Sequence, residues 1–149
     1  MFWLIVLFCI GLDQLTKYLV VSHMTLGQSI PVIPNVLHIT YVLNEGASFS
    51  MLQGQKWLFL VITLAVLIAI CCLLRKIPKE EKWLRWSMAV FVGGMLGNFI
   101  DRLRQGAVID FIDIRVFPIW NVADSLLVLS VIAIAILVLR TETKRKQKP

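Results

Sequence analysis

The cleanest apolar run in the chain, residues 57–74, limits most strongly what this sequence can fold into. It contains no charged side chain. A helix of this length, at 1.5 Å per residue, approaches the roughly 30 Å thickness of a bilayer's hydrocarbon core. Hydrophobic residues make up 58% of the chain and its mean hydropathy is +0.81, above the usual apolar share of a soluble domain. Lipid offers the backbone no hydrogen-bond partners, and the sequence lacks the alternating pattern of a barrel, so the run indicates a membrane-spanning helix.

Three further apolar runs complete a pattern of four spans. The first is interrupted by Asp13 and Lys17, and the last is interrupted only by Asp124. The start of the chain has neither the basic segment nor the small-x-small cleavage site of a signal peptide, so we expect a retained span. The sequence predicts an all-α integral membrane protein with a single domain over residues 1–149 and four transmembrane helices, at about 2–21, 57–74, 86–102 and 121–139.

The distribution of basic residues predicts the orientation of these spans. The net charge is +6, and the basic side chains cluster in segments 75–85 and 140–149. Basic clusters flanking apolar spans are typical of cytoplasmic segments, whereas a nucleic-acid site would need a basic face with stacking aromatics. Four spans place both termini on one side, so we expect both termini in the cytoplasm and segments 23–55 and 102–120 outside.

The first outer segment has a composition unlike that of the spans. Residues 28–52 are rich in β-branched and aromatic side chains and are punctuated by proline and glycine, which predicts a small outer β-structure of two or more short strands. The three cysteines, Cys9, Cys71 and Cys72, lie in apolar runs without metal-ligand spacing. We expect them to be small buried hydrophobic residues.

With this topology, the polar residues of the spans and outer loops gather in one layer near the outer membrane surface. They are Asp13, Lys17, Asn44, Asn98, Asp101, Arg102, Asp110, Asn121 and Asp124. A buried carboxylate is costly unless it is paired, hydrogen-bonded or protonated, and ionisable residues within a membrane commonly mark functional sites. The layer therefore predicts a site at this depth.

Local spacings suggest how part of this layer is held together. Asp13 and Lys17 stand four residues apart on one helix face, which suits either a structural ion pair or a direct catalytic role. Gly93 and Gly97 form a small-xxx-small surface for close helix approach. Asn98, Asp101 and Arg102 share a face of the third helix, so we expect them to orient other groups.

Asp110 and Asp124 are the candidates for chemistry. Asp124 follows Asn121 by three residues, and Asn121 can cap the fourth helix. Each aspartate alone could be a capping or paired residue, but together they suggest the shared-proton pair of aspartic proteases. In such a pair one carboxylate stays ionised and deprotonates a water, while the neutral acid hydrogen-bonds the substrate carbonyl. Neither a metal nor a cofactor is expected.

A small proton-coupled membrane carrier is the alternative, because intramembrane carboxylates also line ion pathways. A carrier should place polar residues through the whole depth of the bilayer and often contains inverted repeats. Here the second span is uncharged, the polar set occupies one layer and no repeat is evident.

Five motifs in order carry a family resemblance. They are "DQLTK" (13–17), "NEGASFS" (44–50), "GGMLGNFIDR" (93–102), "VIDF" (108–111) and "NVADS" (121–125). Together, over essentially the whole chain, they resemble the bacterial lipoprotein signal peptidases, also called signal peptidase II. The resemblance implies a four-helix aspartyl endopeptidase of the bacterial cytoplasmic membrane, with its active site near the outer face. It would cleave diacylglyceryl-modified prolipoproteins before the lipidated cysteine and be inhibited by globomycin-type cyclic peptides.

The resemblance also implies roles for individual residues. The two catalytic aspartates of the family map to Asp110 and Asp124. Its supporting or substrate-binding residues map to Asp13, Lys17, Asn44, Gly46, Asn98, Asp101, Arg102 and Asn121. The chain departs from the common family pattern at Ser48, where a second alanine is frequent. The stretch between the two catalytic motifs is also shorter than in some relatives.

Overall fold

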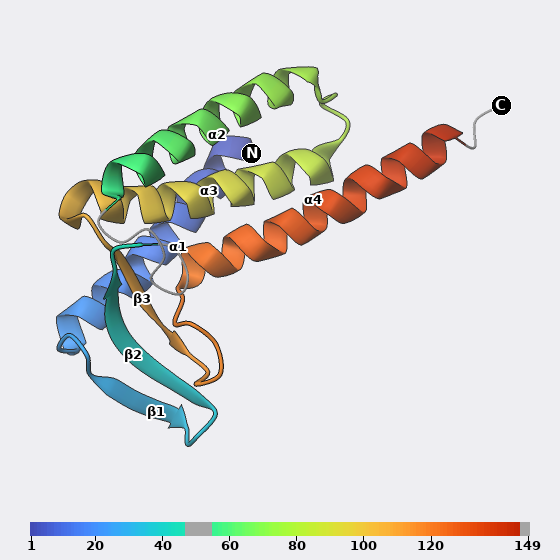
Figure 1. Cartoon of the computed structure of the whole chain (residues 1–149). Coiled ribbons are helices and arrows are strands. Elements are labelled where there is room, and N and C mark those ends of the chain that lie inside the picture. The colour runs from blue at the N-terminus through green and yellow to red at the C-terminus, as the bar shows by residue number, and fades with distance from the viewer. Residues whose placement is uncertain (47–54, 147–149) are drawn as a thin grey trace.

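The computed structural model describes residues 1–46 and 55–146, with the side chains of 142–146 left out. Its elements in chain order are α1 (Phe2–His23), β1 (Ser29–Ile33), β2 (Leu37–Asn44), α2 (Lys56–Lys76), α3 (Lys82–Gln105), β3 (Val108–Asp113) and α4 (Val122–Lys146). The helices gather at one end of the molecule and the strands form a sheet at the other (Figure 1). The fold is mostly helical with a small sheet, as predicted.

Three of the helices are long and apolar enough to cross a membrane within the part of the chain that is described. They are α1, α2 and the Val122–Thr141 portion of α4. Only 11% of the most apolar 18-residue stretch of α2 is buried inside the protein. Helix α3 is long enough, with 24 residues, but it carries several charged side chains near its two ends. Many large apolar side chains of α1, α2 and α4 are exposed on the surface of the protein, as expected for helices that are surrounded by lipid.

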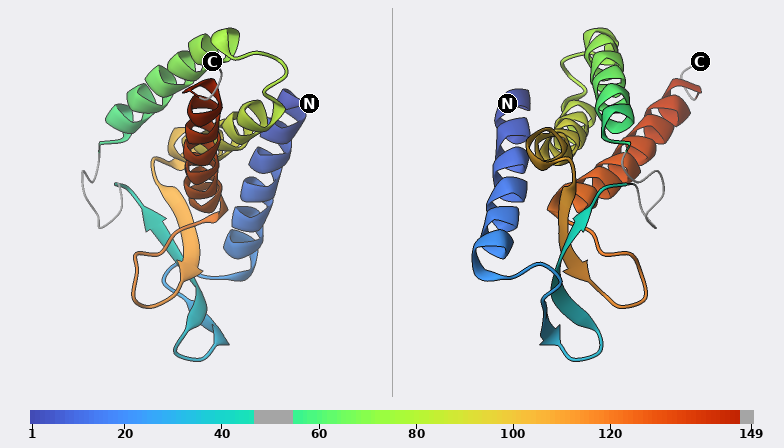
Figure 2. Two further views of the ribbon diagram at one scale, coloured as in Figure 1. Left: turned by 90° about the vertical axis from the view of Figure 1, so that its right-hand side faces the viewer. Right: turned by 60° about the vertical axis from the view of Figure 1, so that its left-hand side comes forward.

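Helix α3 packs against the other three helices and lies between them in Figure 2. Its glycines allow close approach: a Cβ atom at Gly93 would lie 2.5 Å from Cys9 Cβ, and one at Gly94 would lie 2.8 Å from the carbonyl oxygen of Ala123. A Cβ at Gly97 would lie 2.5 Å from Asp13 Oδ2. The predicted surface of Gly93 and Gly97 therefore exists and lets α1 approach α3 closely, while Gly94 does the same for α4.

The sheet has three antiparallel strands in the order β1-β2-β3. Strands β1 and β2 confirm the β-structure predicted for the first outer segment, although residues 47–54 of that segment lie outside the described residues. Strand β3 comes after α3 and pairs with β2, so that Val42 lies opposite Asp110 and Asn44 opposite Val108. This pairing joins the two segments that were predicted to lie outside the membrane into one unit, and the sequence did not predict this pairing.

The cysteine prediction is right for one residue and wrong for two. Cys9 is buried between α1 and α3, whereas Cys71 and Cys72 are exposed. Their helix, α2, packs mainly on α3 and leaves most of its surface on the outside of the protein. Apolar sequence in a membrane helix therefore does not imply burial within the protein, because lipid accepts the same side chains.

Candidate active site

A buried ion network anchors the site between α1 and α3. Lys17 Nζ lies 2.8 Å from Asp13 Oδ2 and 2.8 Å from Asp101 Oδ2. All three side chains are 3% exposed or less. The ion pair predicted from the spacing of Asp13 and Lys17 is thus confirmed, and Asp101 joins it. Because each buried charge has a partner, the network avoids the large cost of an unpaired charge.

The two aspartates of this network also reach the backbone of neighbouring elements. Asp13 Oδ1 accepts a 3.0 Å hydrogen bond from the Ala123 amide, in the first turn of α4. Asp101 Oδ2 accepts a 3.2 Å hydrogen bond from the Ile109 amide of β3. Two carboxylates on α1 and α3 therefore fix the start of α4 and the start of β3, the two elements that carry Asp124 and Asp110.

Asn98 links the ion network to Asp124 through hydrogen bonds at both ends of its side-chain amide. Its Oδ1 accepts from Lys17 Nζ at 2.9 Å and from Asn121 Nδ2 at 3.0 Å. Its Nδ2 donates to Asp124 Oδ1 at 2.8 Å. Since an ammonium group can only donate, Lys17 fixes which end of the Asn98 amide faces Asp124.

Asn121 and Asp124 form a reciprocal cap at the start of α4. The Asp124 amide donates to Asn121 Oδ1 at 2.9 Å, and the Asn121 amide donates to Asp124 Oδ2 at 3.2 Å. The capping role predicted for Asn121 is therefore confirmed. This arrangement follows the capping-box pattern, with an aspartate at the third helical position, and it orders the Asp124 carboxylate.

Asp110 lies on β3 and is 2% exposed. Its Oδ1 accepts from Asn121 Nδ2 at 2.6 Å, and its Oδ2 accepts from Asn44 Nδ2 at 3.0 Å. Burial raises the pKa of Asp110 to about 7, with a smaller contribution from the nearby Asp124 charge, against the hydrogen bonds from Asn44 and Asn121 that lower it. One residue, Asn121, thus donates to both candidate aspartates, to Asp110 from its side chain and to Asp124 from its backbone amide.

Arg102 turns away from the ion network. Its Nη2 donates to the carbonyl oxygen of Gly46 at 3.2 Å, and its guanidinium lies over the Phe59 ring, 4.6 Å from the centroid. Of the three residues predicted to share one face of α3, Asn98 and Asp101 face the buried network, whereas Arg102 contacts Gly46, just after β2, and Phe59 of α2.

A cavity of about 720 Å³ opens beside this constellation. Six of the ten predicted site residues line it: Asn44, Gly46, Asn98, Arg102, Asp110 and Asp124. The other four, Asp13, Lys17, Asp101 and Asn121, lie behind that wall. Apolar side chains of segments 117–120 and 127–129 also line the cavity. The cavity therefore pairs a polar wall that holds two carboxylates with a wall suited to an apolar ligand.

Sequence reasoning did not single out several residues that contact the site. Gln14 Nε2 donates to Asp101 Oδ1 at 2.9 Å, and Trp120 Nε1 donates to Ser125 Oγ at 3.1 Å on the cavity wall. Gln14 and Ser125 stand inside quoted motifs, which is a signal that could have found them. Phe59, in the uncharged run, has no such signal.

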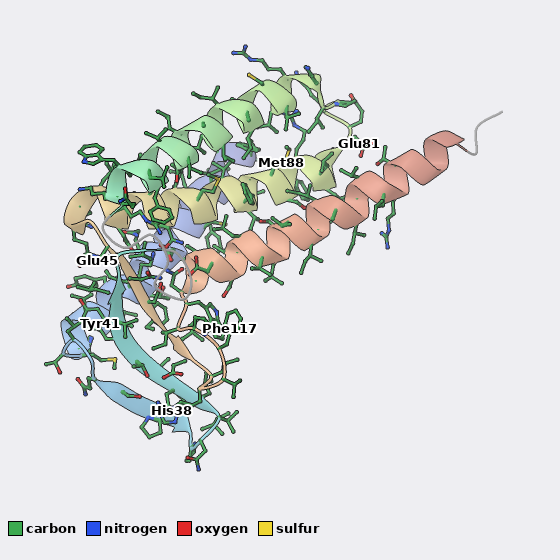
Figure 3. The ribbon with its side chains drawn as sticks, in the orientation of Figure 1. His38, Tyr41, Glu45, Glu81, Met88 and Phe117 are labelled. Atoms are coloured by element: carbon green, nitrogen blue, oxygen red, sulfur yellow. The ribbon has the colours of Figure 1, made fainter. Side chains whose placement is uncertain are left out.

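Asp113, three residues beyond Asp110, belongs to a separate polar cluster. Its carboxylate accepts from Thr40 Oγ1 at 2.7 Å and from the Arg115 amide at 2.8 Å. These hydrogen bonds and the Arg115 charge lower the pKa of Asp113, against a burial effect that raises it. Its cross-strand neighbour His38 is labelled near the far tip of the sheet, whereas Glu45 lies where the sheet meets the helices (Figure 3).

The chain is similar to known proteins over nearly its whole length. The family model described as Signal peptidase (SPase) II matches residues 5–140. The chain is 47% identical over 152 residues to the lipoprotein signal peptidase of Bacillus velezensis, covering 99% of each chain. It is 42% identical to the lipoprotein signal peptidase of Halalkalibacterium halodurans, with 99% of this chain and 97% of that one covered.

Two solved structures have the same fold. One, described as a bacterial membrane enzyme, superposes with a TM-score of 0.91 at 38% identity and covers 99% of this chain and 93% of its own. A second, with the same description, superposes with a TM-score of 0.85 at 39% identity and covers 93% and 92%.

Proposed function

This chain belongs to the signal peptidase II family, and on that premise we propose that Asp110 and Asp124 are the catalytic pair of an aspartic endopeptidase. The protein is a multi-pass membrane peptidase that removes signal peptides from prolipoproteins. The carrier alternative has no support among the relatives. The observation behind the proposed pair is that both carboxylates line one cavity and both accept hydrogen bonds from Asn121.

In the proposed mechanism, Asp110 is the neutral acid and Asp124 the base. Burial keeps a proton on Asp110 up to about pH 7, while the first turn of α4 and the Asn98 amide stabilise negative charge on Asp124. Asp124 removes a proton from a water, and the resulting hydroxide adds to the scissile carbonyl carbon. Asp110 donates its proton to the carbonyl oxygen. When the tetrahedral intermediate collapses, Asp124 returns its proton to the leaving amine and Asp110 is reprotonated by the carbonyl-derived hydroxyl.

The surrounding residues take positioning roles in this mechanism. Asn44, Asn98 and Asn121 each donate to a carboxylate of the pair and hold it in place. The ion network of Asp13, Lys17 and Asp101 fixes the elements behind them. In this proposal Arg102 and Gly46, which both line the cavity, contact the substrate backbone.

The proposed cleavage site lies immediately before a diacylglyceryl-modified cysteine. Leu127, Val128 and Leu129 continue from the cavity onto the outer surface of α4, and the last two are 60% and 64% exposed. Acyl chains in the bilayer can lie along such a surface, so the scissile bond can reach the polar wall without extraction of the lipid. Cleavage of a lipidated prolipoprotein by the purified protein in detergent, followed as a gel shift, tests this function. Cleavage should be blocked by globomycin and unaffected by a chelator, and failure to cleave would refute it.

We also propose that α3 is a fourth span, with both termini in the cytoplasm of the bacterial cell and the cavity near the outer membrane face. Reporter fusions at Pro78 and in the C-terminal tail should then read cytoplasmic, and a fusion at Gln105 should read external. The corresponding prediction for Gln53 lies outside the described residues. An external thiol reagent that labels a cysteine placed at Pro78 in intact cells would contradict this orientation.

The raised pKa of Asp110 leads to a prediction about pH. Cleavage should fall as pH rises through about 7, where Asp110 loses its proton, and should fall again at low pH, where the ionised partner is protonated. The apparent pKa values of this bell-shaped profile belong to the pair. A profile of kcat/KM that stays flat from pH 5 to pH 9 would contradict a two-carboxylate mechanism.

The same shift affects folding stability. The folded pKa of Asp110 lies above the ordinary value of 3.8, so its contribution to stability is complete below about pH 4 and is lost as pH rises to about 7. In detergent, the Tm of wild type should therefore fall as pH rises from about 4 to about 7. The Tm of Asp110→Asn should not show this part of the decrease.

A further inference from the structure

A second cavity lies at the end of the helices away from the sheet. Its volume is about 540 Å³, and it is lined by Met1, Phe2, Lys79, Lys82, Arg85 and Trp86. These residues come from the start of α1, the α2–α3 turn and the start of α3. Figure 3 labels Glu81 in this turn, far from the sheet.

Three basic side chains and two aromatic rings line this cavity. Lys79 and Lys82 are exposed, and neither forms an ion pair among the side chains that the structure describes. Arg85 is half-buried, and its Nη1 donates to the carbonyl oxygens of Leu74 at 2.9 Å and Ile77 at 3.0 Å, which holds the guanidinium at the end of α2. The cavity thus contains positive charge that is only partly compensated within the protein.

The start of α3 adds to this positive potential. A helix N-terminus carries a partial positive charge, so acidic residues usually occupy its first turn and basic residues are disfavoured there. The first turn of α3 contains no acidic residue, and the N-cap, Glu81, makes no side-chain capping hydrogen bond. Glu80 and Glu81 precede the helix, but neither lines the cavity.

The tryptophans beside this cavity indicate that it lies at the level of the lipid headgroups. Trp83 and Trp86 pack edge to face with ring centroids 5.0 Å apart, and Trp83 is 69% exposed. Tryptophan at the end of a span is typical of the headgroup level of a bilayer. Helix α1, with 22 residues, separates this level from the sheet by roughly 33 Å, about the thickness of the hydrocarbon core.

We propose that this cavity binds the headgroup of an anionic phospholipid in the leaflet opposite the catalytic site. The phosphodiester would lie among Lys79, Lys82 and Arg85, and the first methylene groups of the acyl chains would lie against Phe2 and Trp86. A basic pocket between transmembrane helices is a recurrent type of lipid site. A signal peptide begins with positive charge and would not bind among these cations, so the proposed lipid site is separate from the proposed catalytic site.

Binding of phosphatidylglycerol to the purified full-length protein, measured by native mass spectrometry in detergent, tests the proposal. The variant Lys79→Gln/Lys82→Gln should bind this lipid roughly 25-fold more weakly than wild type, because each basic side chain near an anionic lipid contributes about fivefold, or about 1 kcal/mol. Phosphatidylcholine should bind wild type weakly, and millimolar inorganic phosphate should not displace phosphatidylglycerol.

The matched control is Arg75→Gln/Lys76→Gln, which removes two exposed cations from the same end of the protein without touching the cavity. This control should bind phosphatidylglycerol as wild type does, and both double variants should cleave a prolipoprotein in detergent at the wild-type rate. If the two double variants lost lipid binding equally, the net charge of this end of the protein would explain the loss without the cavity, and the proposal would be overturned. Displacement by inorganic phosphate would overturn it as well, in favour of a free-phosphate site.

Discussion

Replacing Asp110 or Asp124 by asparagine is expected to abolish cleavage of a lipidated prolipoprotein in a gel-shift assay. An amide fills the same space and can still hydrogen-bond, but it cannot take the proton of a water or donate a carboxyl proton. General acid or base assistance contributes roughly 10²–10⁴ in rate, so either loss should leave little visible product. Since the two carboxylates act as a unit, the double variant should be scarcely slower than either single variant.

Both single variants should remain in the membrane and fold, which separates a loss of chemistry from a loss of structure. An asparagine at position 110 keeps one oxygen that can accept from either Asn121 or Asn44, and an asparagine at position 124 keeps one that can accept from the Asn98 amide. Each single variant therefore loses one hydrogen bond at its carboxylate and keeps the other. Circular dichroism and Tm in detergent measure this. A variant that cleaves at more than a tenth of the wild-type rate would contradict its role in the pair.

Lys17→Met is expected to reduce the free energy of unfolding by about 3–5 kcal/mol, the usual cost of removing one partner of a buried ion pair. The substitution leaves Asp13 and Asp101 as neighbouring buried carboxylates without their cation. These carboxylates hold the first turn of α4 and the start of β3, so activity should fall together with stability. Unfolding of the purified protein in detergent, followed by circular dichroism, measures the change.

Two companion variants make this prediction sharper. Lys76→Met removes an exposed lysine at the end of α2 and should change stability by less than about 0.5 kcal/mol. Asp13→Asn/Lys17→Met/Asp101→Asn removes all three charges and should be more stable than Lys17→Met alone, because no unpaired charge remains buried. The ion network would have no structural role if Lys17→Met were as stable as wild type.

The helices and the layer of polar residues could be predicted because a membrane leaves few choices. Runs such as 57–74 have to form helices, and charged or amide side chains within them have to converge on one another. The spacing of Asp13 and Lys17 predicted their ion pair, and the position of Asn121 predicted the cap of α4. These are local patterns, which the fold preserves.

What could not be predicted depends on contacts between distant segments. The pairing of β3 with β2 sets Asp110 beside Asn44, and no local pattern specifies which strands become neighbours. Asp101 was expected to orient other groups, but its contacts with Lys17 and Ile109 depend on how α1 and β3 pack on α3. The exposure of Cys71 likewise depends on which side of α2 faces α3.

The most direct test of the central claim compares Asp110→Asn with Asp113→Asn in one gel-shift assay. Both substitutions replace a buried carboxylate of β3 by an amide, three residues apart in the same strand. Only Asp110 lines the cavity and contacts Asn121, whereas Asp113 contacts Thr40 and Arg115. We expect Asp113→Asn to cleave with most of the wild-type activity and Asp110→Asn to give no visible product. An active Asp110→Asn beside an inactive Asp113→Asn would contradict the assignment of the catalytic pair.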